Sequence, residues 1–507
     1  MVTMKKYLPI LLIFLLGIIL RFIYFPENIY FGYDQARDVF TAISLLQGHL
    51  KLIGPPSSFN SNIFHGPLIY YLYAPFLWLF SGNIETISAF FRVYNAFGVF
   101  LTYLIGTIIF NKRVGVFSAL LFAISFEESQ YALFLGHPAL AVIPVLTYYL
   151  GLTWLIFRRE WKGLPLAAVS LGLAIQFHYI NILLLLGLIV TLTIFYQEIK
   201  NTLNWRYTLF TLSGFFLSIS PFLISEIKYN FRLFQAALST VSSLGGMGDG
   251  MNFSYGVMAI QRFVNHNFIF EVRGSLIVIT VLAAGIIWLI HNGQYRKKGI
   301  FILIWLLGGI LPYLVTKTPS YYFGAGASVS LLILAAFILD KLWKKFPLAA
   351  LLILLAFVFS NLKQEMDLNK KGPNLDMVIQ PQMLISDEKK TLDYIYQDAK
   401  GKPLAVRSLG VPLSVNTTWS YLFEWYGKSR YGYLPAWIGP VASGYAGNLT
   451  VNNDRGSLPA YYYLIVEPTV GIREGIKEQF FEEEGYFTKV VEEKQFGEFK
   501  VQKRERY

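Results

Sequence analysis

The chain has 507 residues, of which 55% are hydrophobic, 17% aromatic and 15% charged, and its formal net charge is +12. This composition excludes an ordinary soluble protein and indicates a membrane protein with several spans. The basic excess does not require a nucleic-acid partner, because the cytoplasmic loops of membrane proteins concentrate Lys and Arg. The chain has no cysteine, which excludes disulfides, thiolate nucleophiles and cysteine metal sites.

Eleven apolar segments are predicted to cross the membrane, and the first, residues 7–25, is interpreted as a retained helix because no cleavage site follows it. The other ten are residues 87–110, 114–131, 139–157, 164–177, 179–197, 207–224, 275–291, 300–315, 322–340 and 347–362. One further run, "PLIYYLYAPFLWLF" at residues 67–80, has 14 residues, two prolines and many aromatic side chains. We interpret it as an interfacial or re-entrant segment, because it is too short to span.

The distribution of cations sets the predicted orientation. With residues 67–80 outside the count of spans, the cytoplasmic segments hold 15 Lys and Arg residues and the longer outer loops hold 7. This bias predicts a cytoplasmic N-terminus and an extracytoplasmic C-terminus. The first outer loop, residues 26–86, and the tail after residue 362 then lie on the same side of the membrane.

The first outer loop contains the charged stretch "YDQARD". Asp34 is predicted to be the N-cap of an amphipathic helix that lies along the membrane surface. Asp34, Arg37 and Asp38 are spaced so that their side chains meet at the start of this helix. A capping aspartate with a surface ion pair is the structural alternative to a functional site.

Three motifs follow one another in a characteristic order: "DQAR" from residue 34, "HGPL" from residue 65, and Arg92 near the outer start of the next span. Together they resemble the lipid-sugar-dependent glycosyltransferases of the GT-C superfamily, in particular the family 39 type with protein mannosyltransferases and aminoarabinose transferases. The resemblance covers most of residues 7–340. Gln35 stands where the family has a second acidic residue, and Gly66 replaces the first proline of the other motif.

Sugar transfer from a polyprenyl phosphate to a hydroxyl needs a base that takes the acceptor proton, and Asp34 is the candidate. The leaving phosphate needs cations, for which Arg37 and Arg92 are candidates, with Lys228 and Arg232 on the same side. Simple snorkelling is the alternative role for Arg92. A divalent cation is a possible cofactor, with Asp34 and Asp38 as candidate ligands, although Gln35 weakens that case.

Further substrate-binding candidates lie on the predicted outer side. They are Asp38, His65, His137, Glu226, Tyr321 and Tyr322. Glu127 and Glu128 are weaker candidates, with helix capping as the alternative. His178 lies at a turn between two spans and is predicted to satisfy backbone groups rather than to bind a ligand.

The tail changes composition after residue 362. Residues 363–386 are predicted to be a linker, and residues 387–507 an extracytoplasmic α/β domain. We expect a helix at residues 387–399, strands at "KPLAVRSL" and "YYYLIVE", a helix at "GIREGIKEQFFEEEG" and a terminal hairpin at "KVVEEKQFGEFKVQK". Residues 1–362 would form the catalytic transmembrane domain.

The predicted fold is therefore a polytopic α-helical membrane protein of GT-C type with a C-terminal α/β domain. The predicted function is an inverting hexosyl- or pentosyltransferase, located in the plasma membrane if the cell is prokaryotic. Its partners would be a polyprenyl-phosphate-sugar donor, a lipid, glycan or protein acceptor, and membrane lipids, without nucleic acid. A transporter or flippase of lipid-linked sugars is the alternative, but its spans would carry buried charges and show repeat symmetry. A catalytically inactive scaffold would leave Asp34 and Arg92 unexplained.

Overall fold

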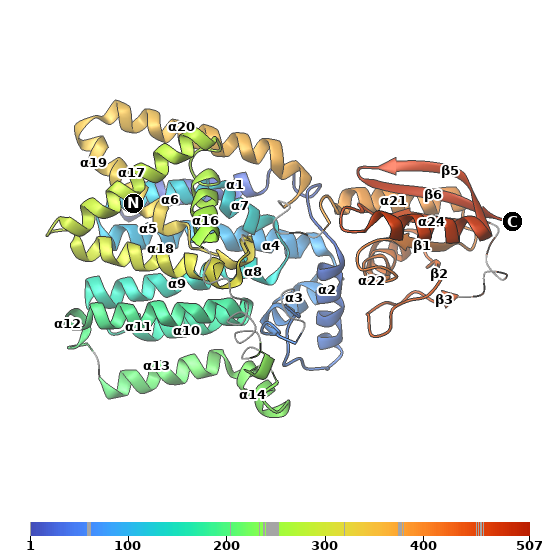
Figure 1. The fold of residues 1–507 in the computed structure, drawn as a ribbon, viewed down its shortest axis with the longest axis horizontal. Coiled ribbons are helices and arrows are strands. Elements are labelled where there is room, and N and C mark those ends of the chain that lie inside the picture. Colours follow the sequence, from blue (N-terminus) through green and yellow to red (C-terminus); the bar gives the residue numbers. More distant parts are fainter. Residues whose placement is uncertain are drawn as a thin grey trace.

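The computed structural model of the chain consists of a large helical domain and a C-terminal α/β domain beside one end of it (Figure 1). The structure describes all residues except 1, 58–61, 203, 233, 237–238, 240–252, 319, 374–377, 379, 453, 455, 457–458 and 460. The α/β domain lies at the right in Figure 1, next to α2 and α3. The α/β domain lies against one end of the helical bundle, and the candidate site is at this end.

The helical domain is built from apolar segments that alternate with short polar turns. Its first half consists of α1 (Val2–Arg21), α2 (Tyr33–Leu46), α3 (Leu68–Leu79), α4 (Ile84–Ala96), α5 (Gly98–Ile109), α6 (Lys112–Ala123), α7 (Phe126–Leu133), α8 (His137–Leu140), α9 (Val142–Thr153), η1 (Trp154–Arg158) and α10 (Gly163–Phe177). Its second half consists of η2 (Tyr179–Leu183), α11 (Leu184–Ile194), α12 (Tyr196–Ile199), α13 (Trp205–Ser218), α14 (Ser220–Lys228), α16 (Phe253–Asn265), α17 (Val272–His291), α18 (Arg296–Thr316), η3 (Tyr321–Phe323), α19 (Val329–Lys345), α20 (Pro347–Leu368) and η4 (Asn369–Lys371). Each of the eleven predicted segments is helical over most of its length.

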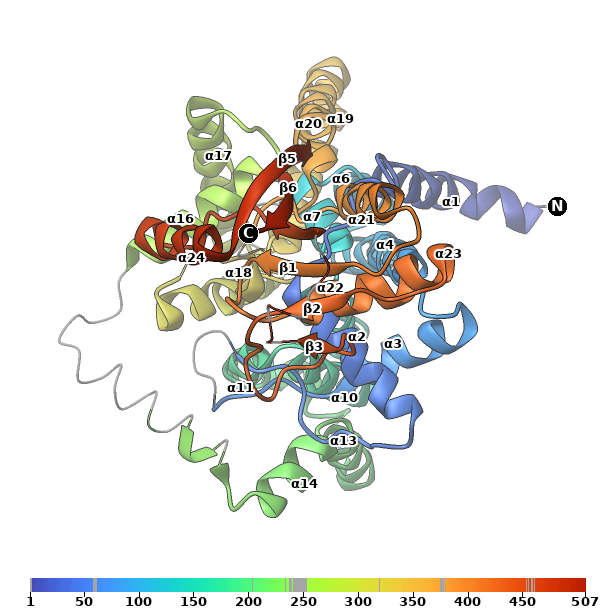
Figure 2. The same ribbon diagram turned by 90° about the vertical axis from the view of Figure 1, so that its right-hand side faces the viewer.

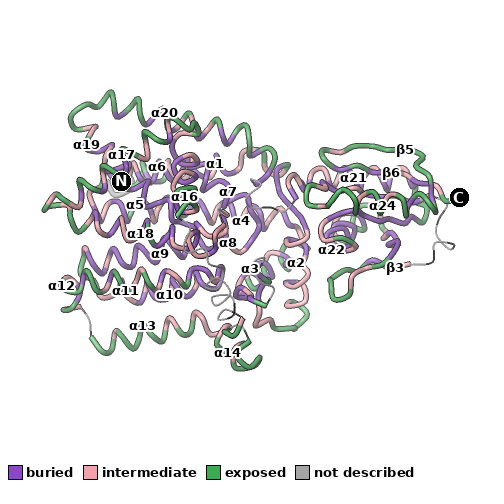
Figure 3. The backbone as a smooth tube through the Cα atoms, in the orientation of Figure 1, coloured by how far each residue is buried: buried purple, intermediate pink, exposed green. Residues whose placement is uncertain are grey.

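The described helices include clear membrane spans. By length and composition alone, 5 of them can cross a membrane, or up to 6 if α13 and α14, which meet at a 61° bend, form one span. Shorter apolar helices, among them α3 and α10, add to the bundle. Side chains on α13, α17 and α20 that would face lipid are exposed, including Phe210, Ile277 and Phe359, whereas the interior of the bundle is buried (Figure 3).

The first outer loop supplies the end of the bundle next to the α/β domain. Helix α2 packs against α3, and both lie across this end in Figure 1. The position of the N-cap differs from the prediction, because it is Gly32 and not Asp34. Asp34 lies in the first turn instead, where a carboxylate interacts favourably with the helix dipole. Its role is therefore not that of a cap.

The C-terminal domain is a six-stranded mixed sheet with helices (Figure 2). The strand order is β3-β2-β1-β4-β6-β5, in which β1 pairs in parallel with β2 and β4, and β6 pairs antiparallel with β4 and β5. Its elements are α21 (Ile385–Ala399), β1 (Ala405–Leu409), α22 (Thr417–Leu422), η6 (Phe423–Lys428), α23 (Ser429–Tyr431), β2 (Ala436–Ile438), β3 (Val451–Asn452), β4 (Tyr461–Val466), α24 (Glu474–Phe487), β5 (Thr488–Phe496) and β6 (Phe499–Arg506). Both predicted helices, both predicted strands and the hairpin are present, whereas β2 and β3 were not predicted.

The two domains are joined by main-chain pairing immediately before α2. The N–H of Phe31 donates to the carbonyl of Met383, and the N–H of Ile385 donates to the carbonyl of Ile29. Side chains extend this contact, since the hydroxyl of Tyr421 donates to the carbonyl of Gly82. The α/β domain is thus attached to the segment that leads directly into α2.

Candidate functional site

A cavity of about 130 Å³ opens at the end of the helical domain near the α/β domain. The start of α2, the loop before α3, the α7–α8 junction, the α10–η2 junction and η3 all contribute side chains to it. Its lining residues are Asp34, Gln35, Arg37, Asp38, Pro56, Ser57, His65, Phe134, Leu135, Gly136, His137, His178, Tyr179, Tyr322 and Phe323. The cavity therefore collects five of the predicted substrate-binding side chains together with the candidate base.

Asp34, Arg37 and Asp38 form one ion-paired group on the first two turns of α2. The Arg37 guanidinium donates from Nη1 to Asp34 Oδ1 at 2.6 Å, and from Nε and Nη2 to Asp38 Oδ1 at 2.9 and 2.8 Å. The Asp34 side chain is 46% exposed and that of Asp38 only 3%. Asp38 is thus the buried support of the guanidinium, and Asp34 is the carboxylate that a ligand can reach.

Burial changes the acidity of the supporting carboxylate. Loss of hydration raises the pKa of Asp38 to about 6, against the lowering effect of the Arg37 charge. Asp38 is therefore mostly ionised at pH 7 and mostly protonated at pH 5. The charge of Asp38 therefore changes between pH 5 and pH 7, and the strength with which Asp38 holds Arg37 changes with it.

Gln35 has a structural role in this helix. Its Oε1 accepts from the N–H of Gly32 at 3.1 Å, and its Nε2 donates to the carbonyl of Leu135 at 2.9 Å. The first bond lies within the N-terminal turn of α2, and the second ties the start of α2 to the α7–α8 junction. The amide at this position can both accept and donate, which a carboxylate cannot do.

Three histidines form one wall of the cavity. His65 precedes α3, His137 begins α8 and His178 follows α10, yet their rings are in mutual contact. The Nδ1 of His178 accepts from the N–H of Ile180 at 3.3 Å, as its predicted backbone role requires. Sequence reasoning did not predict His178 as a lining residue, although its predicted position on the same outer side as the other two was a usable signal.

Two predicted site residues lie elsewhere. Arg92 is buried and donates to the carbonyl of Arg21 at 2.5 Å and to Asn28 Oδ1 at 2.8 Å, so it joins α1 to α4 rather than lining the cavity. Tyr321 is also buried, with its hydroxyl on His266 Nδ1 and its ring 4.3 Å from the Arg262 guanidinium. Both side chains are absent from the cavity for the same reason. Each is long, lies near the end of a predicted span and bonds to partners inside the bundle.

The weaker acidic candidates are also part of the interior. Glu127 accepts from Asn267 Nδ2 at 2.8 Å and lies 3.5 Å from Arg262, while Glu128 accepts from Asn95 Nδ2 at 3.1 Å. Both are fully buried on α7 and do not line the cavity. Their contacts join α7 to α4 and α16, so the structure gives them a packing role.

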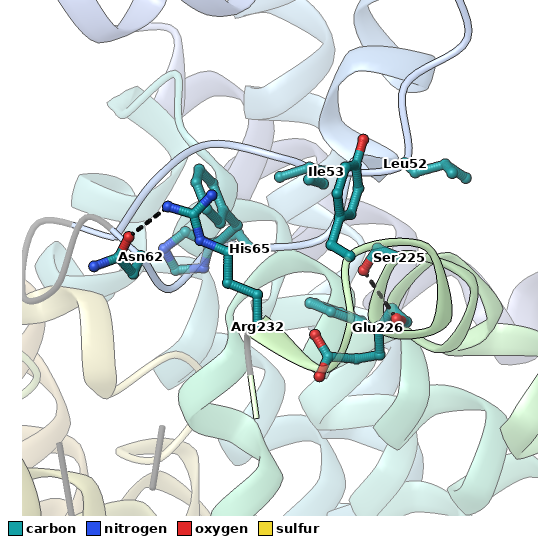
Figure 4. A pocket seen from close by; sticks show the side chains of 10 residues that line it. Leu52, Ile53, Asn62, His65, Ser225, Glu226 and Arg232 are labelled. Atoms are coloured by element: carbon teal, nitrogen blue, oxygen red, sulfur yellow. Dashed lines mark hydrogen bonds between the residues drawn. The ribbon is translucent and has the colours of Figure 1, made fainter. Parts of the chain in front are cut away.

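Glu226 and Arg232 line a second, more apolar cavity of about 150 Å³ (Figure 4). In this cavity Arg232 donates to Asn62 Oδ1 at 2.8 Å, and the backbone N–H of Phe234 donates to Glu226 Oε2 at 3.0 Å. His65 lines both cavities, so the two are neighbours across its ring. The structure therefore separates Glu226 from Asp34 but keeps it beside the same site.

The pair formed by Asp34 and Asp38 does not fit a divalent cation. The Arg37 guanidinium lies between the two carboxylates and bonds to both of them. A dication at the same place would have to displace this cation and separate two charge-assisted hydrogen bonds. The two aspartates are therefore assigned to holding Arg37.

Part of the chain matches a known protein family. Residues 64–224 match the family model of dolichyl-phosphate-mannose-protein mannosyltransferases. This segment includes His65, His137 and His178 but ends before the C-terminal domain. No curated protein sequence matches the chain.

The solved structures that are similar cover almost the whole chain. The structure of ArnT from Cupriavidus metallidurans, bound to undecaprenyl phosphate, has a TM-score of 0.60 at 11% identity, and the match covers 97% of each chain. The same protein in the apo state has a TM-score of 0.61 at 11% identity, covering 99% of this chain and 98% of that one. The oligosaccharyltransferase of Archaeoglobus fulgidus is a more distant match, with a TM-score of 0.47, 14% identity and coverage of 85% and 65%. The ArnT matches show that the chain has the same fold as that protein, including its C-terminal domain.

Proposed function

We propose that this chain is a glycosyltransferase that transfers a sugar from a polyprenyl-phosphate donor to a hydroxyl acceptor; the family match of residues 64–224 and the ArnT-like fold support this proposal. The observation that carries the proposal is that two charged side chains lie side by side in the same cavity. One is the exposed carboxylate of Asp34, and the other is the guanidinium of Arg37, which the buried Asp38 holds in place. The first can take a proton and the second can hold a phosphate.

The proposed reaction inverts the anomeric carbon. The acceptor hydroxyl loses its proton to Asp34 as its oxygen attacks the anomeric carbon, and the bond from that carbon to the phosphate oxygen breaks on the opposite face. The electron pair of the broken bond leaves with polyprenyl phosphate. Asp34 uses Oδ1 for Arg37, and no hydrogen bond engages its other oxygen in the described part of the chain, so this oxygen is available to the acceptor.

The two neighbouring cavities support a lipid-linked donor. The first is the more polar of the two and contains the charged group of α2, whereas the second is lined by Leu52, Ile53, Phe64 and Phe222. A donor with a charged sugar phosphate and an isoprenoid chain has the same division of polarity. His65 between the cavities marks the expected position of the phosphate.

The orientation of the protein is also proposed. Connections rich in Lys lie at the end away from the C-terminal domain, where Lys297 pairs with Glu198 and Lys344 with Asp340 (Figure 1). The positive-inside bias makes that end cytoplasmic, so the cavity and the α/β domain face the extracytoplasmic side. Sugar transfer would then occur on the outer face, with a lipid, glycan or protein as acceptor.

Replacement of Asp34 by Asn tests the proposal. The purified full-length protein is reconstituted in nanodiscs with a radiolabelled polyprenyl-phosphate sugar, and transfer should fall about 10²–10⁴-fold in Asp34→Asn because the base is lost. Asp387→Asn is the matched control, since Asp387 also lies in the first turn of a helix and pairs with a cation three residues later. Wild-type turnover of Asp34→Asn with an active donor would overturn the proposed role.

A further inference from the structure

Three of the six histidines of the chain are gathered at one place. The ring centroids of His65 and His137 are 3.8 Å apart, those of His65 and His178 are 4.5 Å apart, and those of His137 and His178 are 5.5 Å apart. One ring nitrogen from each lies within 4.8 Å of the other two. The three come from separate segments of the chain, so local sequence does not account for their meeting.

Ring packing explains part of this arrangement but not all of it. His65 also packs on Tyr179, with ring centroids 5.0 Å apart, as an aromatic cluster would. However, the Nδ1 of His65 is buried and has no hydrogen-bond partner among the residues that the structure describes, and the His65 residue is only 4% exposed. A buried ring nitrogen without a partner is unfavourable, so a bound group that satisfies it is expected.

The chemistry of the three side chains suits a metal-ligand set. A neutral imidazole keeps a nitrogen lone pair and is a common ligand of divalent transition metals. The contact from Ile180 to His178 Nδ1, at 3.3 Å, is longer than a usual hydrogen bond, so it competes only weakly for that ring.

The charges around the histidines permit a cation. Arg37 lies on the same cavity and acts against one, but it is paired with both Asp34 and Asp38. With both carboxylates ionised, this group carries a net charge of −1. The other titratable side chains that line the cavity, Tyr179 and Tyr322, are neutral there.

We propose that His65, His137 and His178 bind one divalent transition-metal ion of the Zn²⁺ or Co²⁺ class, with the remaining coordination position open to the cavity. Three imidazoles and one exchangeable oxygen ligand are a common zinc set. Binding requires the ring nitrogens to approach one another to about 3.3 Å, which small side-chain rotations can supply. If the proposed function holds, the natural oxygen ligand is the donor phosphate, whereas the metal site itself does not depend on that function.

Metal binding is measured on the full-length protein purified with an affinity tag that contains no histidine. After treatment with a chelator and its removal, Co²⁺ is added and its visible absorption and bound stoichiometry are recorded. We expect about one Co²⁺ per chain, displaced by Zn²⁺, and an affinity about 10–100-fold lower in both His137→Gln and His178→Gln. His49→Gln, at an exposed position outside the cavity, is the matched control and should bind as the wild type does.

The outcomes separate this inference from the proposed function. Size-exclusion profiles establish that each variant is folded, and His178→Asn offers a smaller change if His178→Gln is not. Binding that is absent in the wild type, or unchanged in His137→Gln and His178→Gln, overturns the metal site. Asp34→Asn should keep the metal while losing transfer, so a metal-loaded Asp34→Asn with full turnover would refute the proposed base and leave the metal site standing.

Discussion

The buried carboxylate of Asp38 predicts an acid limb in the pH profile of the proposed transfer activity. Its pKa of about 6 in the folded protein lies above the ordinary value of 3.8, mainly because of burial. The folded state therefore binds this proton more tightly than the unfolded chain, and the stabilisation is lost as pH rises through 6, by about 3 kcal/mol in total. The protein keeps the charged form at neutral pH despite this cost, which indicates that the charge anchors Arg37.

The magnitude follows from the fraction of Asp38 that is ionised. About nine-tenths is ionised at pH 7 and about one-tenth at pH 5, so kcat/KM for the lipid-linked donor should fall about tenfold between these values. Burial lowers the pKa of His65 and that of His178, so neither ring accounts for a midpoint near pH 6. The donor is a phosphodiester and stays ionised throughout.

A pH–rate profile from pH 5 to 8 measures this effect in nanodiscs with saturating acceptor. The Asp38→Asn variant should have lower activity at pH 7, because Arg37 loses a charged acceptor, and it should lack the limb with its midpoint near pH 6. Each sample is returned to pH 7 and assayed again. Recovery of activity then excludes irreversible unfolding or aggregation at low pH as the cause of the limb. An acid limb with the same midpoint in Asp38→Asn would refute the reasoning.

Three further changes have definite expected outcomes. Arg37→Lys should weaken donor binding about tenfold, because an ammonium cannot bond Asp34 and Asp38 at once as the planar guanidinium does; donor titration with unchanged affinity would contradict this. A single cysteine at Ser81 should react with an impermeant thiol reagent from the outside of intact cells and one at Lys112 should not, whereas the opposite pattern would invert the proposed orientation. Arg407→Ala should lower the free energy of unfolding by about 3–5 kcal/mol, because it leaves Glu484 buried without its cation; an unchanged melting temperature would disprove this.

Local patterns in the sequence predicted local structure well. Apolar runs were sufficient for the long helices, since each span needs only its own residues to form hydrogen bonds. The meeting of Asp34, Arg37 and Asp38 was predicted from helical spacing and is confirmed by their contacts. The N-cap was placed two residues too late, because Gly32 can begin a helix without a side-chain signal.

Contacts between segments far apart in the chain could not be predicted from the sequence. The inward turn of Arg92 toward Asn28 depends on how α1 and α4 pack, and no spacing encodes it. The parallel pairing of β1 with β2 was missed for a similar reason, since β2 is only Ala436–Ile438 and its partner is fixed by the crossover between them. The gathering of the three histidines likewise requires the fold, because it joins the ends of α10 and the starts of α3 and α8.

The pairing of Phe31 with Met383 and of Ile29 with Ile385 has a consequence for biosynthesis. Residues 29–31 leave the ribosome well before residues 383–385, with which they pair. The segment that leads into α2 therefore lacks these partners until the chain between the two domains has been made. A chain terminated before residue 383 should insert its helices normally and yet leave α2 without this support, so the proposed transfer activity should need the α/β domain.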